Sequence, residues 1–212
     1  GEGCAAVVLK RVADVHGSNS VYAVVKGSAV MSDGNSASLV APNGLAQQLL
    51  MHQTLADAGV KPEDVSYLEA HGTGTKLGDP IEAEAFASVY GRERSDSSPL
   101  YVGAVKANLG HLEPASGMAG LLATIMVLNK QQAPPNALLK KLNPEIAEIG
   151  AVESRKIVFP TELTPLGSAD SLITAALSSF GFSGTICHAL ITQPPKSQAK
   201  ILQSMSPFPR TT

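Results

Sequence analysis

The sequence predicts an α/β domain in which a mixed sheet is covered by helices on both faces. Strand-like and helix-like runs alternate through the middle of the chain, a pattern typical of parallel strands joined by helical crossovers. Pairs of neighbouring strand-like runs near both ends favour antiparallel hairpins. Parallel strands need helices on both faces, so the combination indicates a mixed sheet between helices.

The first pair of strand-like runs covers residues 4–12 and 21–30, and the polar segment 13–20 between them predicts a hairpin turn. The stretch 31–44 is rich in Gly, Ser and Asn and is expected to be a loop.

A helix is predicted next, because Leu45, Leu49 and Ala56 recur at helical spacing and Gly59 is placed to end it. After the strand 65–70, the segment "GDPIEAEAFASVYG" is the clearest helix of the chain. Its start predicts Asp79 as the cap, Pro80 at the first helical position and Glu82 as the end of a capping box. The expected apolar face is Ile81, Ala85 and Val89.

The rest of the chain alternates in the same way. A strand and turn at 100–110 precede a long apolar helix at 115–130 and an irregular connection with prolines. A short strand follows at 156–161, and two more strands, 171–184 and 185–192, meet at a glycine-rich turn.

Composition excludes several classes of protein. Charged residues are 16% of the 212 and the formal net charge is −2, which does not indicate binding to nucleic acid or to a membrane surface. The longest apolar stretch, 118–128, is too short to span a bilayer, and the first residues lack the pattern of a signal peptide. Two cysteines give no disulfide framework, so a reducing, cytoplasmic compartment is expected. The first residue is Gly, so a processed product or a fragment is expected.

Three unusual loops each follow a predicted strand: "EAHGTGT", "KANLGHLEPASG" and "SSFGFSGT". Sites in open α/β sheets form at the carboxyl ends of strands, so the three loops are expected to converge on one pocket. Metal binding is not expected, because the chain has neither C-x-x-C nor H-x₃₋₅-H spacing.

His71 in the first loop has two interpretations. It is either a hydrogen-bonded residue at a strand end, or a neutral imidazole that donates a hydrogen bond to an electron-rich oxygen. Gly72 and Gly74 allow close approach of a ligand to the backbone. The hydroxyls of Thr73 and Thr75 alternate with these glycines and suit an extended ligand with amide groups.

Lys106 and His111 belong to the second loop. Lys106 is predicted to lie on one strand face with Val102 and Ala104, because side chains alternate along a strand. A buried ammonium there must be paired, and it would place positive charge near a reacting centre. In the third loop, the aromatics beside glycines are either core packing or a movable gate with an exposed N–H.

These motifs, together with "GSAVMSDGNSASLVAPNGLAQQ" and "GEGCAAVVLKR", closely resemble the β-ketoacyl synthase family, and most of all the ketosynthase domain of type I polyketide synthases. The resemblance implies a thiolase-like fold with two halves, each a five-stranded mixed sheet between helices. It assigns 1–40 to the end of the N-terminal half, 41–192 to the C-terminal half and 193–212 to a linker or tail.

The resemblance implies decarboxylative Claisen condensation. A cysteine holds the acyl chain, and a malonyl-type extender arrives on the phosphopantetheine arm of an acyl carrier protein, with no cofactor bound to the domain. His71 and His111 match histidines that favour the enolate, and Lys106 matches a lysine that pairs with a carboxylate and orders the site. Residues expected to bind substrate are Thr73 and Thr75 at the pantetheine amides, the gating Phe182, and Gly184.

The sequence departs from the family pattern at the nucleophile. The family's "TACSSS"-like motif does not occur, and Cys4 and Cys187 are interpreted as packing residues. An N-terminal half that carries the cysteine is therefore an expected partner, within a complete domain that is expected to be a homodimer. Two alternatives stay open: a non-catalytic module that binds carrier proteins, and a relative that decarboxylates malonyl groups without condensation.

Overall fold

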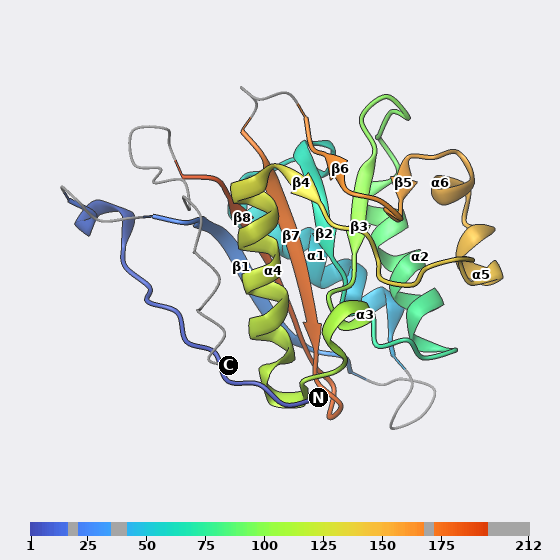
Figure 1. Ribbon diagram of the computed structural model, residues 1–212, viewed down its shortest axis with the longest axis horizontal. Coiled ribbons are helices and arrows are strands. Elements are labelled where there is room, and N and C mark those ends of the chain that lie inside the picture. The colour runs from blue at the N-terminus through green and yellow to red at the C-terminus, as the bar shows by residue number, and fades with distance from the viewer. Residues whose placement is uncertain (17–20, 35–41, 168–171, 195–212) are drawn as a thin grey trace, which may run out of the picture.

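The computed structural model describes residues 1–16, 21–34, 42–167 and 172–194, and its centre is a six-stranded mixed sheet (Figure 1). The order across this sheet is β1 (Val24–Ser32), β8 (Thr185–Thr192), β7 (Thr174–Phe180), β2 (Val65–Glu69), β3 (Leu100–Gly103) and β5 (Ile157–Val158). Strands β7, β2, β3 and β5 are parallel, while β8 runs antiparallel between β1 and β7. A small second sheet pairs β4 (Gln132–Ala133) with β6 (Thr164–Pro165).

Helices cover both faces of the large sheet, which confirms the predicted fold class, although the sheet has six strands rather than the expected five because β1 adds to its edge. Helices α1 (Gly44–Ala58) and α2 (Gly78–Tyr90) lie on one face, and α4 (Ser116–Lys130) lies on the other (Figure 1). Strand β2 shows the alternation, since Leu68 belongs to the core under α1 and α2 whereas Tyr67 belongs to the core under α4. The remaining helices are short: α3 (Lys106–Leu109), α5 (Pro144–Ala147), α6 (Gly150–Glu153) and three 3₁₀ turns at Val12–Asp14, Pro62–Asp64 and Glu113–Ala115.

Helix α1 forms where it was predicted but buries a different face. Gly59 ends it with a left-handed φ of 62°, as expected. Leu45 and Leu49 are 72% and 61% exposed, and Ala56 is exposed as well, so the residues whose spacing predicted the helix are not the ones that it buries. A second stripe of apolar residues also recurs at helical spacing, and α1 turns that stripe toward β1 and β8. The buried residues of α1 are Ala46, Gln47, Leu50, Met51, Thr54 and Leu55.

The predicted N-terminal hairpin is wrong. Only the second run forms a strand, β1, and it pairs with β8 from Val24↔Thr192 to Ser32↔Thr185. Residues 4–11 form no strand, and Val8 is 97% exposed. Strand β1 is the edge strand of the sheet, with β8 on one side, and residues 4–11 do not pair with its open side. The start of the chain lies against Leu112 instead, where a Cβ added to Gly3 would be 3.0 Å from a side-chain carbon of Leu112. Strand β1 therefore joins the sheet formed by the segment 41–192.

The other predicted elements are present with small shifts of their ends. The helix expected at 115–130 is α4, and the two last strands form the β7–β8 hairpin, which closes at Phe180↔Ile186. Part of the predicted loop 31–44, the boundary at residue 40 and the tail from residue 195 lie outside the described residues.

Among the described residues, the structure contains no helix that is both long enough and apolar enough to cross a membrane.

Candidate active site

The structure brings the three unusual loops together at the carboxyl ends of β2, β3 and β7. The ring of His71, after β2, lies 6.1 Å from the ring of His111 and nearly perpendicular to it, with an interplanar angle of 89°. The ring of Phe180, the last residue of β7, lies 5.2 Å from that of His71. Loops that are far apart in the sequence therefore form one constellation, because parallel strands end at the same edge of the sheet.

The tautomer of His71 follows from its hydrogen bond. Its Nδ1 accepts a hydrogen bond from the backbone N–H of Phe180 at 3.3 Å, so Nδ1 carries no proton and the hydrogen is on Nε2. Burial lowers the pKa of His71 from 6.5 to about 4, and the charges of Lys106 and His111 act in the same direction. At neutral pH the ring is therefore an uncharged donor through Nε2.

His111 has the same arrangement on the second loop. Its Nδ1 accepts from the backbone N–H of Glu113 at 2.9 Å, and the Ser116 hydroxyl lies 3.1 Å from the same atom. The neutral ring must then carry its hydrogen on Nε2. Backbone amides thus orient both histidines so that each presents an Nε2–H donor, an arrangement suited to stabilising an oxygen that gains negative charge.

Two carboxylates of α2 hold the loop 71–75 in place. Glu82, which is buried, accepts hydrogen bonds from the backbone N–H groups of His71 at 2.7 Å and Gly72 at 2.9 Å. Asp79 accepts from those of Gly74 at 3.0 Å and Thr75 at 3.3 Å. Burial raises the pKa of Glu82 to about 7, although both amide donors favour the ionised form.

The predicted capping roles of Asp79 and Glu82 are therefore wrong. Helix α2 begins at Gly78, so Asp79 and Pro80 already lie within its first turn, and the residue before the helix, Leu77, makes no side-chain cap. Instead the hydroxyl of Thr75 accepts a hydrogen bond from the N–H of Gly78 at 3.0 Å. The side chains of Asp79 and Glu82 bond to the loop because its amides have no strand partner.

The glycines and threonines of this loop differ in their surroundings. Gly72 has a φ of 47°, and a Cβ added to it would lie 2.9 Å from the Cβ of Ala104, so only glycine allows the first two loops to pack this closely. Gly74, with φ of 76°, has open space around it. Thr73 is half-buried, whereas Thr75 is exposed and keeps its hydroxyl hydrogen for another partner.

Lys106 is not on a strand, contrary to the prediction. Strand β3 ends at Gly103, and Lys106 is the first residue of α3, because the carbonyl of Ala104 accepts from the N–H of Ala107 at 2.9 Å and starts a helical turn. The side chain is half-buried, and no carboxylate of the described residues forms an ion pair with it. Burial lowers the pKa of Lys106, while three carboxylates raise it: those of Glu82, Glu69 and Asp79.

Glu69 is a site residue that the sequence reasoning missed. It is only 2% exposed, and its carboxylate accepts from the Tyr67 hydroxyl at 2.7 Å and from the backbone N–H of Val105 at 2.6 Å. Burial raises its pKa, whereas the two donors and Lys106 lower it. The available signal was a carboxylate at the end of an apolar strand, two residues before His71.

Phe182 and Gly184 lie in the tight turn between β7 and β8. Phe182 is 85% exposed, and Gly184 has a φ of 91° and donates its N–H to the carbonyl of Gly181 at 3.1 Å. The aromatic ring that contacts His71 is that of Phe180 rather than that of Phe182. Phe180 is thus a second missed residue, for which the sequence signal was its position at the end of the strand.

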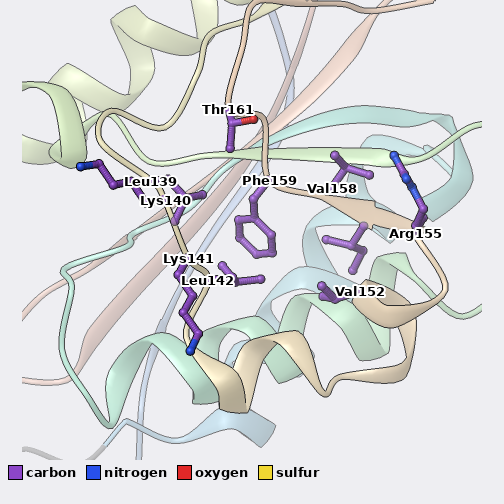
Figure 2. A pocket seen from close by; sticks show the side chains of 10 residues that line it. Leu139, Lys140, Lys141, Leu142, Val152, Arg155, Val158, Phe159 and Thr161 are labelled. Atoms are coloured by element: carbon purple, nitrogen blue, oxygen red, sulfur yellow. The ribbon is translucent and has the colours of Figure 1, made fainter.

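Two cavities formed by the described residues are lined by neither His71 nor His111. One of about 280 Å³ is centred on Phe159 and lined by Leu142 and Val152, with Lys140, Lys141 and Arg155 at its edges. Figure 2 shows that the nitrogen atoms of these three cations point away from Phe159, in different directions. None of the predicted site residues lines this cavity.

A second cavity, of about 300 Å³, borders Glu69 and residues 103–105, and so lies against the turn that leads to Lys106. Within the ranges that the structure describes, no three His, Cys, Asp or Glu side chains come together as ligands for a metal ion.

The pKa of His71 leads to a prediction about pH. We expect the His71 ring to titrate with a midpoint near 4 rather than 6.5, because burial disfavours the imidazolium. Between these values the unfolded chain binds a proton that the folded chain does not, so the contribution of His71 to stability is complete above pH 6.5 and is lost as the pH falls toward 4. Ring resonances in a heteronuclear NMR titration measure the midpoint, and a value near 6.5 would contradict the buried, neutral state.

Comparisons with known proteins agree with the resemblance. The sequence model of the family described as "Beta-ketoacyl synthase, C-terminal domain" matches residues 22–140, which include His71, Lys106 and His111. The chain is 43% identical over 208 residues to a phenolphthiocerol/phthiocerol polyketide synthase of Mycobacterium bovis, and this covers 98% of the chain and 11% of that protein. It is also 43% identical over 195 residues to polyketide synthase GfsA of Streptomyces halstedii, which covers 91% of the chain and 2% of that protein.

Solved structures give the same result. The ketosynthase from module 1 of the bacillaene synthase of Bacillus amyloliquefaciens FZB42 superimposes with a TM-score of 0.75 and 38% identity, over 82% of this chain and 32% of that one. This likeness confirms the thiolase-like α/β fold. The chain spans about a tenth or less of the length of the two curated relatives above and about a third of the solved ketosynthase.

Proposed function

Because this chain belongs to the β-ketoacyl synthase family, as the C-terminal portion of the ketosynthase of a polyketide synthase, we propose that it forms the malonyl-binding side of a site for decarboxylative Claisen condensation. The extender unit would be a malonyl-type thioester on the phosphopantetheine arm of an acyl carrier protein. The nucleophilic cysteine would come from an N-terminal half, in a complete domain that is a homodimer.

The proposed step uses the two Nε2–H donors on one oxygen. The malonyl carboxylate leaves as carbon dioxide, and the electron pair of the broken bond moves to the α-carbon and its thioester carbonyl. His71 and His111 donate hydrogen bonds to the enolate oxygen that results. The carbanion then attacks the acyl thioester on the cysteine, a carbon–carbon bond forms, and the cysteine leaves as a thiolate. Preorganised donors that face developing charge lower the barrier of such a step.

The observation that carries this proposal is the pair of imidazoles whose Nδ1 atoms are held by backbone amides. Both Nδ1 atoms are occupied as acceptors, so neither ring can act as a base through that atom while the loops keep their conformation. With Nδ1 as an acceptor, each ring carries its hydrogen on Nε2, which leaves both Nε2–H groups as donors. A carrier-protein-binding module without chemistry would not need two such donors, so the enzyme is favoured over the module.

A malonyl decarboxylase-like relative is the second candidate. The chain has the two histidine donors, which suffice to stabilise an enolate, and it lacks a nucleophile motif. Decarboxylation without condensation needs only that part of the site. The residue at the nucleophile position of the N-terminal half decides between these two functions.

The test compares residues 1–212 alone with a complete domain that adds a ketosynthase N-terminal half. We expect no condensation by the chain alone, because Cys4 is exposed in the segment without strand structure and Cys187 lies within strand β8, where burial raises the pKa of its thiol. We also expect the lone chain to self-associate, because α4 leaves Met126 46% and Leu122 39% exposed.

The complete domain is expected to release carbon dioxide and to form the β-keto product from an acyl donor and malonyl carrier protein. Release of carbon dioxide without product would favour the decarboxylase. Acylation of Cys4 or Cys187 in the lone chain would contradict the assignment of the nucleophile to the other half.

A further inference from the structure

Asn136 is a buried amide at the place where the pairing of β3 with β5 ends. The last pair of that ladder is Tyr101↔Val158. Beyond it, the Nδ2 of Asn136 donates to the carbonyls of Val102 at 3.0 Å and Pro160 at 3.2 Å, and so joins the ends of the two strands. The side chain is 9% exposed. Such a bridge is what a purely structural amide would make at a sheet edge.

The third bond of Asn136 reaches further, toward the site. Its Oδ1 accepts from the backbone N–H of Ala104 at 2.9 Å. The next amide, that of Val105, is held by Glu69. Two consecutive backbone amides directly before Lys106 are therefore fixed by buried side chains, and the carbonyl of Ala104 then starts α3.

Ala104 also contacts the first loop of the site. A Cβ on Gly72 would lie only 2.9 Å from the Cβ of Ala104, so the backbone of the loop 71–75 packs directly on this residue. A shift of Ala104 would move Lys106, which follows it closely in the chain, and would also move Gly72, the neighbour of His71. Ala104 borders the cavity of about 300 Å³ on another side, but its contact with Gly72 leaves no free space, so a displacement of Ala104 toward the loop 71–75 must move that loop.

We propose that Asn136 is a positioning residue of the site: through its bond to the Ala104 N–H it sets the turn that carries Lys106 and supports the loop that carries His71. The kinetic part of this inference rests on the proposed condensation, because it assigns Asn136 an effect on the malonyl step. Neither Lys106 nor His71 touches Asn136 through a hydrogen bond of its own among the described residues.

The test uses two substitutions of Asn136 that separate its bonds. Asn136→Ala removes all three. Asn136→Asp keeps an oxygen for the Ala104 N–H but loses the two donated bonds and places a carboxylate beside the carbonyls of Val102 and Pro160. Asn136→Asp is therefore expected to lower stability more than Asn136→Ala does, because buried carbonyl oxygens then face an anion. It is nevertheless expected to retain more activity, because the bond to the Ala104 N–H is kept.

In a complete ketosynthase domain, Asn136→Ala is expected to lower the kcat of malonyl decarboxylation about 10- to 100-fold, since small displacements of a positioned group have effects of this size. KM is expected to change by a smaller factor than kcat, because the loop 71–75, which is assigned to the pantetheine amides, is also held by Glu82 and Asp79. Asn136→Asp should stay within a few-fold of the unmodified domain. All rates are measured at a temperature at which circular dichroism shows each variant to be folded.

Asn129→Ala is the matched control. Asn129 also donates its amide to two backbone carbonyls, those of Tyr22 at 3.0 Å and Ile125 at 2.7 Å, but it lies near the end of α4 that is far from Ser116 and His111. This control is expected to lose stability without a change in kcat. The inference would be overturned if the kcat values of the two Asn136 variants followed their stabilities, so that Asn136→Asp was slower than Asn136→Ala. Asn136 would then be a structural residue.

A second measurement does not depend on catalysis. The ε-ammonium of Lys106 is titrated by NMR in the complete domain and in Asn136→Ala. The groups that act on Lys106 are Glu69 on β2, Asp79 and Glu82 on α2, and His71. Release of the turn should expose the ammonium to water and move its titration toward 10.5, the ordinary value.

The two failures are distinguishable. A complete domain that neither condenses nor decarboxylates would refute the proposed function. A shift of the Lys106 titration midpoint in Asn136→Ala would still support Asn136 as the residue that sets the turn. An unmoved titration, together with a kcat equal to that of Asn129→Ala, would refute the inference and leave the proposed function intact.

Discussion

Replacing His111 by alanine in a complete ketosynthase domain is expected to lower the rate of malonyl decarboxylation by roughly 100- to 1,000-fold, which is the effect of removing one preorganised donor from an oxyanion site. Acyl transfer onto the nucleophilic cysteine should continue, because the Nε2–H of His111 is assigned to the malonyl thioester. Release of carbon dioxide and formation of the acyl-enzyme are measured separately, so that the two half-reactions are resolved.

His52→Ala is the control for this substitution. His52 is exposed on α1, on the opposite face of the sheet from α4, and its removal should leave both half-reactions unchanged. Decarboxylation at the normal rate in the His111 variant would show that the ring does not act on malonyl. Equal loss of both half-reactions would instead indicate that Nδ1 of His111 serves mainly to order the start of α4 through Glu113 and Ser116.

Glu82→Ala is expected to damage both stability and activity. The substitution removes the acceptor of two backbone amides, those of His71 and Gly72, and hydrogen bonds to a charged group contribute about 1.5–3 kcal/mol each. Because burial of the carboxylate itself opposes folding, we expect the free energy of unfolding to fall by about 2–4 kcal/mol. Decarboxylation should fall as well, since the loop that aims the His71 ring loses its support.

Urea unfolding at pH 8 measures the stability effect, because the Glu82 carboxylate, whose pKa is raised to about 7, is then mostly ionised. Glu84→Ala provides the comparison, since Glu84 lies on the same helix but is exposed. Equal unfolding free energies for the two variants would mean that water satisfies the loop amides as well as Glu82 does, and the loop would not depend on this carboxylate.

The sequence by itself determined the elements that have a strong local signal. The long apolar helix α4, the final hairpin and the end of α1 at Gly59 follow from periodicity and from glycine's access to left-handed backbone. The convergence of His71 and His111 was predictable as well, because residues after parallel strands meet at one edge whatever the details of packing. Sequence order and chain geometry suffice for such statements.

Tertiary structure decided what local sequence leaves undetermined. Helix α1 has two apolar stripes, and only contact with β1 and β8 selects the stripe that is buried. The run 4–12 has strand composition but does not pair with the open edge of β1, and the chain just before it packs against Leu112 through Gly3. Both outcomes depend on which surface is available to each segment, and that is a property of the assembled sheet.

The polar residues of the site show the same division. Asp79, Glu82, Glu69 and Asn136 have ordinary local interpretations as caps, a strand end or part of an irregular connection. In the folded chain each carboxylate or amide accepts from backbone N–H groups of a site loop that has no strand partner there. A buried backbone N–H group needs a hydrogen-bond acceptor, and in a loop without a strand partner this is the nearest acceptor in space. No local pattern of the sequence specifies which residue that is.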